Sequence, residues 1–327
     1  MKAIIYDRYG SADVLRCEEI EQAPPRENEV LIRVHAASVN PLDWHFMRGT
    51  PRAMRLGLGW SKPKITRVGV DVAGRVEAVG CKVTRFKPGD SVFGVCRGAF
   101  AEYVCALESE LAIKPDTIAF EQAAALPIAA LTAMQGLRDK GRLQPGQKVL
   151  VNGASGGVGT FTVQIAKHLG AHVTGVCSTR NVDLVQSLGA DRVIDYTKQD
   201  VTKLGDRYDI FLDCVINHSL SACRRVLNPK GRYIMIGGGT PNDSGFTLFG
   251  RVMKMQIMSL FASQSLMMMM AKANRQDLAT LAELMSTSKI RAAIDRCYPL
   301  HQVPDAIRYV EAGHARGKVI VSVEQGQ

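Results

Sequence analysis

Short apolar stretches separated by turn residues make up the chain as far as about residue 120. These stretches predict strands at residues 29–36, 74–79, 91–95 and 101–104, with Pro88-Gly89-Asp90 as a turn. Because short strands at such spacing usually pair with their neighbours, this part of the chain predicts a small, mostly antiparallel β-domain.

Beyond residue 120 the pattern changes to longer alternating segments. A helical segment is predicted over residues 121–137, and the strands predicted after it lie at residues 149–152, 173–177, 192–194, 209–214 and 232–236. A helix-like stretch or a turn separates each strand from the next. Strands alternating with helices are typical of a parallel, doubly wound α/β sheet.

The longest apolar region is rich in methionine and covers residues 253–270. Lys254, Gln256 and Gln264 lie within it, so a membrane-spanning helix, which needs about 20 mainly apolar residues, is not expected. A sheet-edge strand is predicted instead, starting at Gln256 and ending at Ala262, with a buried helix after it. The methionines also suit subunit packing, a pliable substrate wall or shallow membrane contact.

The last part of the chain predicts helices at residues 277–286 and 303–312 and a strand at residues 318–323. These elements do not extend a six-stranded parallel sheet, and we expect them to return and complete the first domain. A chain of 327 residues, 46% of them hydrophobic, exceeds the usual size of a single core. The predicted segments are therefore 1–122, 123–262 and 263–327.

A glycine-rich turn joins the strand at residues 149–152 to a helix, and a second strand follows, as in a βαβ unit. Relative to the dinucleotide-binding pattern G-x-G-x-x-G, the turn reads Ala154-x-Gly156-x-x-Gly159. Gly156 lets the backbone approach a phosphate, and Gly159 lets the helix approach the strand. The alternative is a glycine turn without a ligand. The predicted cofactor-binding residues of the turn are Ala154, Ser155, Gly156, Gly157, Val158 and Gly159.

The end of the second strand bears on which dinucleotide binds, because an NAD site usually offers an acidic residue there. The sequence reads Cys177-Ser178-Thr179-Arg180-Asn181, without a carboxylate. Ser178 can donate a hydrogen bond to a 2′-phosphate and Arg180 a charge-assisted one, so NADP(H) is predicted rather than NAD(H). The alternative is that Arg180 only solvates a surface turn. Residues 213–217 and 237–239 follow neighbouring strands and are also expected to border the cofactor.

Net charge and cysteine usage narrow the classes of function. The chain carries a net charge of +10, but the basic residues are dispersed and lack interleaved aromatics, which argues against RNA binding as the main role. Its eight cysteines form no C-x-x-C pair and no zinc-knuckle spacing. They indicate buried apolar residues in a reducing compartment. The first residues resemble a strand rather than a secretory signal, so a cytoplasmic protein is expected.

Seven segments, in this order, resemble the medium-chain dehydrogenase/reductase superfamily and within it the zinc-independent quinone oxidoreductase group that includes zeta-crystallin. These segments are Ala37-Ser38-Val39-Asn40-Pro41-Leu42-Asp43, Gly69-Val70-Asp71-Val72-Ala73-Gly74, Pro88-Gly89-Asp90, Gly98-Ala99-Phe100-Ala101-Glu102-Tyr103, Leu126-Pro127 with Thr132-Ala133, the glycine turn, and Gly317-Lys318-Val319. The resemblance implies a GroES-like catalytic domain over 1–122 completed by 263–327, a Rossmann NADP-binding domain over 123–262, and an active site between them. It also implies a homodimer paired through the last Rossmann strand, which the sequence predicts from Gln256 to Ala262.

The resemblance further implies individual contacts. NADPH would be bound by the glycine turn, the 178–180 region and Tyr196. Gly237 and Gly238 are expected to contact it on the separate ground given above, because they follow a strand of the sheet. The residues implied near the nicotinamide are Asn40, Pro127, Thr132, Val215 and Lys318.

Related zinc alcohol dehydrogenases carry a cysteine where Asn40 stands and a G-H-E motif where this chain reads Gly69-Val70-Asp71. Neither a catalytic nor a structural zinc is therefore expected. His45, the nearby imidazole, is expected to take a core or rim position rather than to bind a metal.

Without zinc, electron-poor acceptors are favoured over simple alcohols. We therefore expect hydride transfer from NADPH to a quinone, with reduction of an alkenal or enoyl C=C bond as the alternative and a zeta-crystallin-like RNA-binding role as a less favoured one. Hydrogen bonds from Asn40, from a cofactor hydroxyl or from backbone N–H groups could stabilise charge on the acceptor oxygen. Asp43 could orient Asn40 or cap the helix that starts near Trp44.

Overall fold

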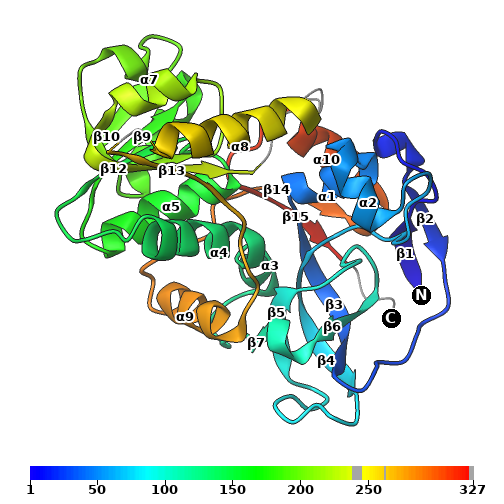
Figure 1. Cartoon of the computed structure of the whole chain (residues 1–327). Coiled ribbons are helices and arrows are strands. Elements are labelled where there is room, and N and C mark those ends of the chain that lie inside the picture. The colour runs from blue at the N-terminus through cyan, green and yellow to red at the C-terminus, as the bar shows by residue number, and fades with distance from the viewer. Residues whose placement is uncertain (238–244, 261–262, 324–327) are drawn as a thin grey trace. The chain divides into compact units, whose positions relative to one another are not determined.

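The computed structural model describes residues 1–237, 245–260 and 263–323. The chain divides into two compact units (Figure 1). The first unit contains Met1–Leu131 and Ala273–Gln327, and the second contains Thr132–Lys272. Each unit has its own sheet, one mostly antiparallel and one parallel, which confirms the predicted fold class.

The second unit is built on a six-stranded parallel sheet in the order β10-β9-β8-β11-β12-β13. Its strands are β8 (Lys148–Asn152), β9 (His172–Cys177), β10 (Arg192–Asp195), β11 (Tyr208–Asp213), β12 (Leu227–Ile236) and β13 (Ser265–Met269). This is the doubly wound Rossmann order, in which the chain reverses direction between β8 and β11. The carboxyl ends of these two strands form the switch point where ligands bind in such sheets.

Helices cover the sheet of the second unit and account for its apolar strands. They are α5 (Gly157–His168), α6 (Val182–Ser187), α7 (Leu220–Arg225) and α8 (Gly245–Leu260). Leu150, Phe211 and Tyr233 lie in the core that forms between the layers. Strands buried on both faces need continuous apolar runs, which is why the central strand β8 contains the run Val149-Leu150-Val151.

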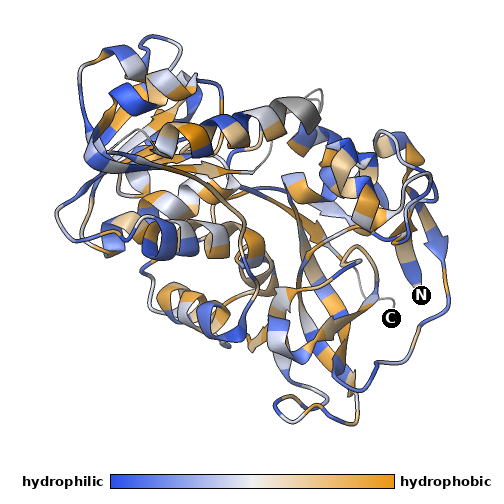
Figure 2. Cartoon of the chain, viewed as in Figure 1, coloured by the Kyte–Doolittle hydropathy of each residue, from blue (hydrophilic) through white to orange (hydrophobic). Residues whose placement is uncertain are grey.

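The methionine-rich region folds differently from the prediction. Residues 256–260 belong to helix α8, so the predicted edge strand at 256–262 is wrong, and residues 261–262 lie outside the described residues. Val252, Met255 and Met258 pack against the core at helical spacing, and apolar and polar bands alternate along α8 (Figure 2). The edge strand is β13, which pairs with β12. Over the described ranges, no helix is long and apolar enough to cross a membrane.

The first unit contains a seven-stranded sheet in the order β14-β15-β3-β4-β5-β7, in which β6 also pairs with β3. Its strands are β3 (Glu29–Val39), β4 (Asp71–Val79), β5 (Ser91–Val95), β6 (Tyr103–Leu107), β7 (Leu111–Ile113), β14 (Ile294–Pro299) and β15 (Lys318–Ser322), and β1 (Lys2–Ile5) and β2 (Arg16–Glu19) form a separate pair. Because β15 pairs with β3, this late part of the chain belongs to the first unit.

The helices of the first unit are α1 (Pro41–Arg48), α2 (Arg55–Leu58), α3 (Phe120–Ala124), α9 (Arg275–Ser286) and α10 (Val303–Glu311), while α4 (Pro127–Gln135) starts in the first unit and ends in the second. The single helix predicted over 121–137 is wrong, because α3 and α4 are separate. Pro127 has no N–H to continue α3 and instead occupies the first position of α4. In Figure 1, α9 lies beside β7, far from it in sequence.

Short helical turns connect these elements. They are η1 (Ala12–Val14), η2 (Arg52–Met54), η3 (Glu108–Glu110), the π-type turn η4 (Gly136–Lys140), η5 (Thr179–Asn181), η6 (Val201–Lys203) and η7 (Leu300–Gln302).

Candidate functional site

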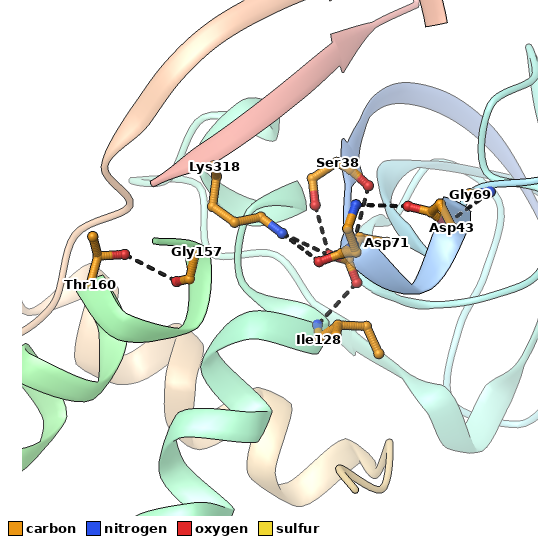
Figure 3. Close-up of polar contacts among 9 residues, drawn as sticks. Ser38, Asp43, Gly69, Asp71, Ile128, Gly157, Thr160 and Lys318 are labelled. Carbon is orange, nitrogen blue, oxygen red and sulfur yellow. Dashed lines mark hydrogen bonds and ion pairs between the residues drawn. The ribbon is translucent and has the colours of Figure 1, made fainter. Parts of the chain in front are cut away.

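Asp71 is the centre of a buried polar network in the first unit (Figure 3). Its Oδ2 accepts the hydroxyl of Ser38 over 2.7 Å and the amide Nδ2 of Asn40 over 2.8 Å. Its Oδ1 accepts the backbone N–H of Ile128 over 3.0 Å, in the first turn of α4. A carboxylate is favourable at this end of a helix, because the N–H groups there have no partner within the helix.

Lys318 supplies the positive charge of the same network. It is the first residue of β15, is 2% exposed, and its Nζ lies 2.7 Å from Asn40 Oδ1 and 3.4 Å from Asp71 Oδ2. Burial lowers the pKa of Lys318, whereas the Asp71 carboxylate opposes that shift. A buried charge is stable only when it is paired and hydrogen-bonded, and here the ammonium and carboxylate groups satisfy each other.

Asn40 and Asp43 fix the beginning of α1. Asn40 precedes the helix as its N-cap residue, and its backbone N–H donates to Asp43 Oδ2 over 2.8 Å. The other oxygen of Asp43 accepts the N–H of Gly69 over 3.2 Å. Burial raises the pKa of Asp43 to about 7, against the effect of these two donors. Asp43 therefore holds the backbone of Asn40 and stabilises the start of α1. The sequence had left these two roles, orienting Asn40 and capping the helix, as alternatives.

The side-chain amide of Asn40 is fully used within the protein. Nδ2 donates to Asp71 and, over 3.3 Å, to the carbonyl oxygen of Ser38, while Oδ1 accepts from Lys318. An amide group has two N–H donors, and both have protein acceptors here. This arrangement favours a positioning role for Asn40 over direct donation to a substrate.

The residues that replace the zinc ligands of the related alcohol dehydrogenases have other partners. In the part of the chain that the structure describes, no three His, Cys, Asp or Glu side chains gather closely enough to hold a metal ion. Asp71 faces Lys318, and Val70 has no donor atom in its side chain. His45 stacks on Trp44 with 3.7 Å between ring centroids, and its Nδ1 lies 2.8 Å from the carbonyl oxygen of Thr50.

The glycine turn of the second unit joins β8 to α5, as predicted. A Cβ on Gly159 would lie 2.0 Å from the carbonyl oxygen of Gly153, so the close approach of helix and turn requires glycine there. A Cβ on Gly156 would meet only that same oxygen, at 3.4 Å, an ordinary contact. Packing within the protein therefore explains Gly159 but does not explain Gly156.

Gly156 is the N-cap residue of α5, and no side chain among the described residues caps this helix. Thr160 bonds within the first turn, where its hydroxyl donates to the carbonyl oxygen of Gly157 over 3.0 Å (Figure 3). Among the described residues, the N–H groups at the start of α5 thus have no side-chain acceptor. This combination fits the pyrophosphate of a dinucleotide.

The end of β9 brings together the residues predicted to select the cofactor. Ser178 follows β9 directly, Arg180 is exposed in η5, and the backbone N–H of Tyr196 donates to the carbonyl oxygen of Cys177 over 3.0 Å. The ring of Tyr196 is 60% exposed. Asn181, which the sequence analysis did not single out, hydrogen-bonds both Ser155 and Ser178.

The neighbouring strand β10 adds a carboxylate that the sequence analysis missed. Asp195 pairs with Cys177 in the sheet and accepts the hydroxyl of Thr179 over 2.6 Å. It also accepts the N–H of Thr197 over 3.0 Å and lies 3.4 Å from the ammonium of Lys198. The hydrogen bond from Thr179 is the main cause that lowers the pKa of Asp195 to about 2. Only the pairing of two predicted strands could have revealed this residue, because it lies far from 177–181 in sequence.

Asp213 ends β11 beside the glycine turn and holds the loop that follows it. Its Oδ1 accepts Nδ2 of Asn152 over 2.9 Å and the backbone N–H groups of Val215 and Ile216 over 3.1 and 2.9 Å. Its Oδ2 accepts the hydroxyl of Tyr233 over 2.8 Å. Ile216 has a φ of +65°, which is unfavourable for a β-branched residue, and these bonds maintain it. The adjacent Val215 is 48% exposed at the carboxyl end of the sheet.

The remaining predicted residues are placed as follows. Pro127 begins α4, Thr132 is buried in the same helix, and Ala154 is buried in the glycine turn. Gly157 and Val158 form the first turn of α5 with Gly159. Gly237 is exposed with a φ of +79°, and Gly238 lies outside the described residues.

Comparison with known proteins agrees with this arrangement. Residues 26–116 match the family described as alcohol dehydrogenase GroES-like domain, and residues 188–321 match the family described as zinc-binding dehydrogenase. A mitochondrial NAD(P)H oxidoreductase of Mus musculus is 35% identical over 99% of this chain and 89% of its own length. The chain belongs to the medium-chain dehydrogenase/reductase superfamily. Within it, the chain is an oxidoreductase of the quinone oxidoreductase-like group.

Two further relatives indicate how widely this group varies. A chloroplastic quinone-oxidoreductase homolog of Spinacia oleracea is 33% identical over 98% of both chains. A chloroplastic NADPH-dependent alkenal/one oxidoreductase of Arabidopsis thaliana is 34% identical over 98% of this chain and 79% of its own length.

Solved structures of the group are also similar. The quinone oxidoreductase of Coxiella burnetii has a TM-score of 0.85 at 28% identity, over 99% of both chains. The Escherichia coli quinone oxidoreductase, solved with NADPH, has a TM-score of 0.85 at 25% identity, over 98% of this chain and 100% of the other.

Proposed function

We propose that this chain is an NADPH-dependent, zinc-independent reductase that transfers hydride to a quinone or a similar electron-poor carbonyl compound. The observation that carries the proposal is the start of α5, where a helix end without a side-chain cap adjoins Gly156 and the space beside it. Anionic ligands bind at such helix ends. The E. coli quinone oxidoreductase solved with NADPH supports the same cofactor class.

The end of β9 supports NADPH over NADH. Ser178, Arg180 and Tyr196 offer a hydroxyl, a guanidinium and a phenol at one corner, and these groups suit a 2′-phosphate. Asp195 would oppose a phosphate if its charge were free. Its bonds to Thr179 and Thr197 and its ion pair with Lys198 offset that charge locally.

In this proposal the two units divide the work. The second unit binds the cofactor. The bound cofactor would supply a hydride to the electron-poor carbon of the acceptor. In the first unit, Lys318, Asn40 and Asp43 keep the start of α1 and β15 in a fixed geometry, so their role is positional. Water supplies the proton that completes reduction of the acceptor oxygen.

The cofactor assignment is tested with Arg180→Ala. We expect the KM for NADPH to rise at least about tenfold more than the KM for NADH, because only NADPH carries the 2′-phosphate that the guanidinium would contact. Arg207→Ala, an exposed arginine of the same unit, serves as the control and is expected to change neither constant. Equal changes for both cofactors would refute the phosphate assignment. Stoichiometric zinc in the purified enzyme would refute the zinc-independent part.

Reduction of an activated C=C bond is the second candidate. It is favoured by the 34% identity to the Arabidopsis alkenal/one oxidoreductase, since a quinone and an enone both accept hydride at an electron-poor carbon. Parallel measurement of kcat/KM for an ortho-quinone and a short enone with NADPH separates the two. The substrate with the higher kcat/KM identifies the class.

We also propose a homodimer that pairs through β13. This strand is the last of the six in the parallel sheet and pairs with β12 on one side. No other strand of the described residues pairs with its outer side, which could therefore pair with a second copy. Sedimentation equilibrium tests this proposal. A monomer at micromolar concentration would contradict it.

A further inference from the structure

Asn181 is the last residue of η5 and directly precedes α6. An asparagine before a helix can accept an N–H of the first helical turn through its side chain. Here the side chain makes no such bond. The asparagine is 5% exposed. Its side chain is used for something other than helix stability.

The amide nitrogen of Asn181 connects two serines from different segments. Nδ2 donates to the hydroxyl of Ser155 over 3.0 Å and to the hydroxyl of Ser178 over 3.2 Å. Ser155 lies in the glycine turn and Ser178 follows β9, so one amide links the two loops that we assign to the pyrophosphate and to the 2′-phosphate. Both serines are partly exposed.

This arrangement has a cost within the protein. The other amide atom, Oδ1, is buried and has no hydrogen-bond partner among the described residues. An unsatisfied buried acceptor destabilises a fold. Asn181 thus leaves its oxygen unsatisfied while its nitrogen donates to two hydroxyl groups. Fold stability alone does not explain such a choice.

The chemistry of a hydroxyl group explains what is gained. A serine hydroxyl has one proton to donate and two lone pairs to accept with. Because Ser155 and Ser178 accept from Asn181, each keeps its own proton for another acceptor. Phosphoryl oxygens only accept, so two hydroxyl groups held in this state match two phosphate groups of one dinucleotide.

We propose that Asn181 is a positioning residue for NADPH, which holds the hydroxyl groups of Ser155 and Ser178 at a fixed separation with their protons available to the pyrophosphate and the 2′-phosphate. This inference rests on the proposed cofactor. The inference adds Asn181 to the proposed cofactor site, as a residue that contacts no phosphate and still determines the affinity for NADPH. It also predicts that replacing Asn181 with alanine weakens NADPH binding without lowering the stability of the protein.

The first test is Asn181→Ala, with the Kd for NADPH measured by fluorescence titration and the stability of the unliganded protein by urea denaturation. We expect about tenfold weaker binding, and stability unchanged or higher because the orphan oxygen is removed. Asn228→Ala is the matched control, since the amide of Asn228 donates to Asp209 in the same unit. The control is expected to bind NADPH as the wild type does.

Two further variants test whether Asn181 affects NADPH binding through Ser155 and Ser178. In Asn181→Asp the carboxylate accepts both serine protons and can cap α6, so binding should fall further than in the alanine variant while the protein stays folded. In a Ser155→Ala, Ser178→Ala background, Asn181→Ala should change the Kd less than about twofold, because the asparagine acts through those serines.

Each outcome has one meaning. A wild-type chain that does not bind NADPH overturns the proposed cofactor. A wild-type chain that binds NADPH, together with an Asn181→Ala variant that binds equally well, overturns only the positioning role. A full-sized effect of Asn181→Ala in the serine-free background also overturns it, as does a loss of stability in both Asn181 variants that accounts for the weaker binding.

Discussion

The ammonium group of Lys318 donates to Oδ1 of Asn40 over 2.7 Å, although 278 positions separate the two residues in the sequence. This bond joins the last strand of the first unit to the start of α1. Together with Asp71, it balances a buried positive charge against a buried negative charge. Three distant segments are therefore held by one cluster whose members depend on each other.

Lys318→Met should destabilise the protein by about 3–5 kcal/mol, because the Asp71 carboxylate is then buried without its cation. A second change, Asp71→Asn, should recover part of that loss by removing the orphaned charge. Urea denaturation measures both variants. Lys62→Met, at an exposed lysine, is the control and should stay within about 0.5 kcal/mol of the wild type. Equal stability of Lys318→Met and the control would contradict the ion pair.

The two glycines of the turn should respond differently to alanine. Gly159→Ala places a Cβ against the carbonyl oxygen of Gly153, so the unliganded protein should lose stability. Gly156→Ala meets only an ordinary contact, so the protein should fold normally and bind NADPH at least about tenfold more weakly. Thermal unfolding without cofactor and NADPH titration separate the effects. Wild-type affinity of Gly156→Ala for NADPH would show that the cofactor does not occupy the space beside Gly156.

Asp43 should give the stability a distinctive pH dependence. Burial raises its pKa from 3.8 to about 7, so between about pH 4 and pH 7 the folded chain holds a proton that the unfolded chain has lost. Stability from this group is therefore present at low pH and is lost as the pH rises, by at most about 1.4 kcal/mol per unit. Asp43→Asn should remove this slope. Parallel curves of unfolding free energy against pH for variant and wild type would show that Asp43 ionises normally.

Asp213→Ala should affect both stability and cofactor binding. It removes the acceptor for the N–H groups of Val215 and Ile216, so the left-handed conformation of Ile216 loses its support. We expect a loss of about 3 kcal/mol and weaker NADPH binding. Asp209→Ala, at the other end of β11, also removes a hydrogen-bonded carboxylate but should leave the NADPH affinity unchanged. Equal NADPH affinities in the two variants would show that the loop after β11 does not contribute to cofactor binding.

Local patterns predicted the parts of the fold whose causes are local. The glycine turn and five of the six strands of the parallel sheet agree with the structure, because strand runs and turn residues carry their own signals. The predictions failed where two periodicities compete. Residues 256–260 are apolar enough for a strand, and only packing on β12 and β13 decides that they belong to α8.

The contacts of the candidate site were less predictable than its elements. Asp195 and Cys177 become neighbours because two strands align in parallel, and Lys318 reaches Asp71 because β15 pairs with β3. Such pairings depend on long-range register, which a single sequence does not state. Asn181 could have been noticed as a helix-capping residue, but its donation to two serines depends on the position of the glycine turn.

The position of β15 between β14 and β3 also affects the order in which the two units fold during translation. Residues 132–272 are continuous and can fold as soon as they leave the ribosome, whereas the sheet that begins with residue 29 waits for its last strand. Until then, the nascent chain carries Asp71 without its cation and β3 without one of its partners. The middle of the polypeptide is thus expected to reach its native form before its beginning does.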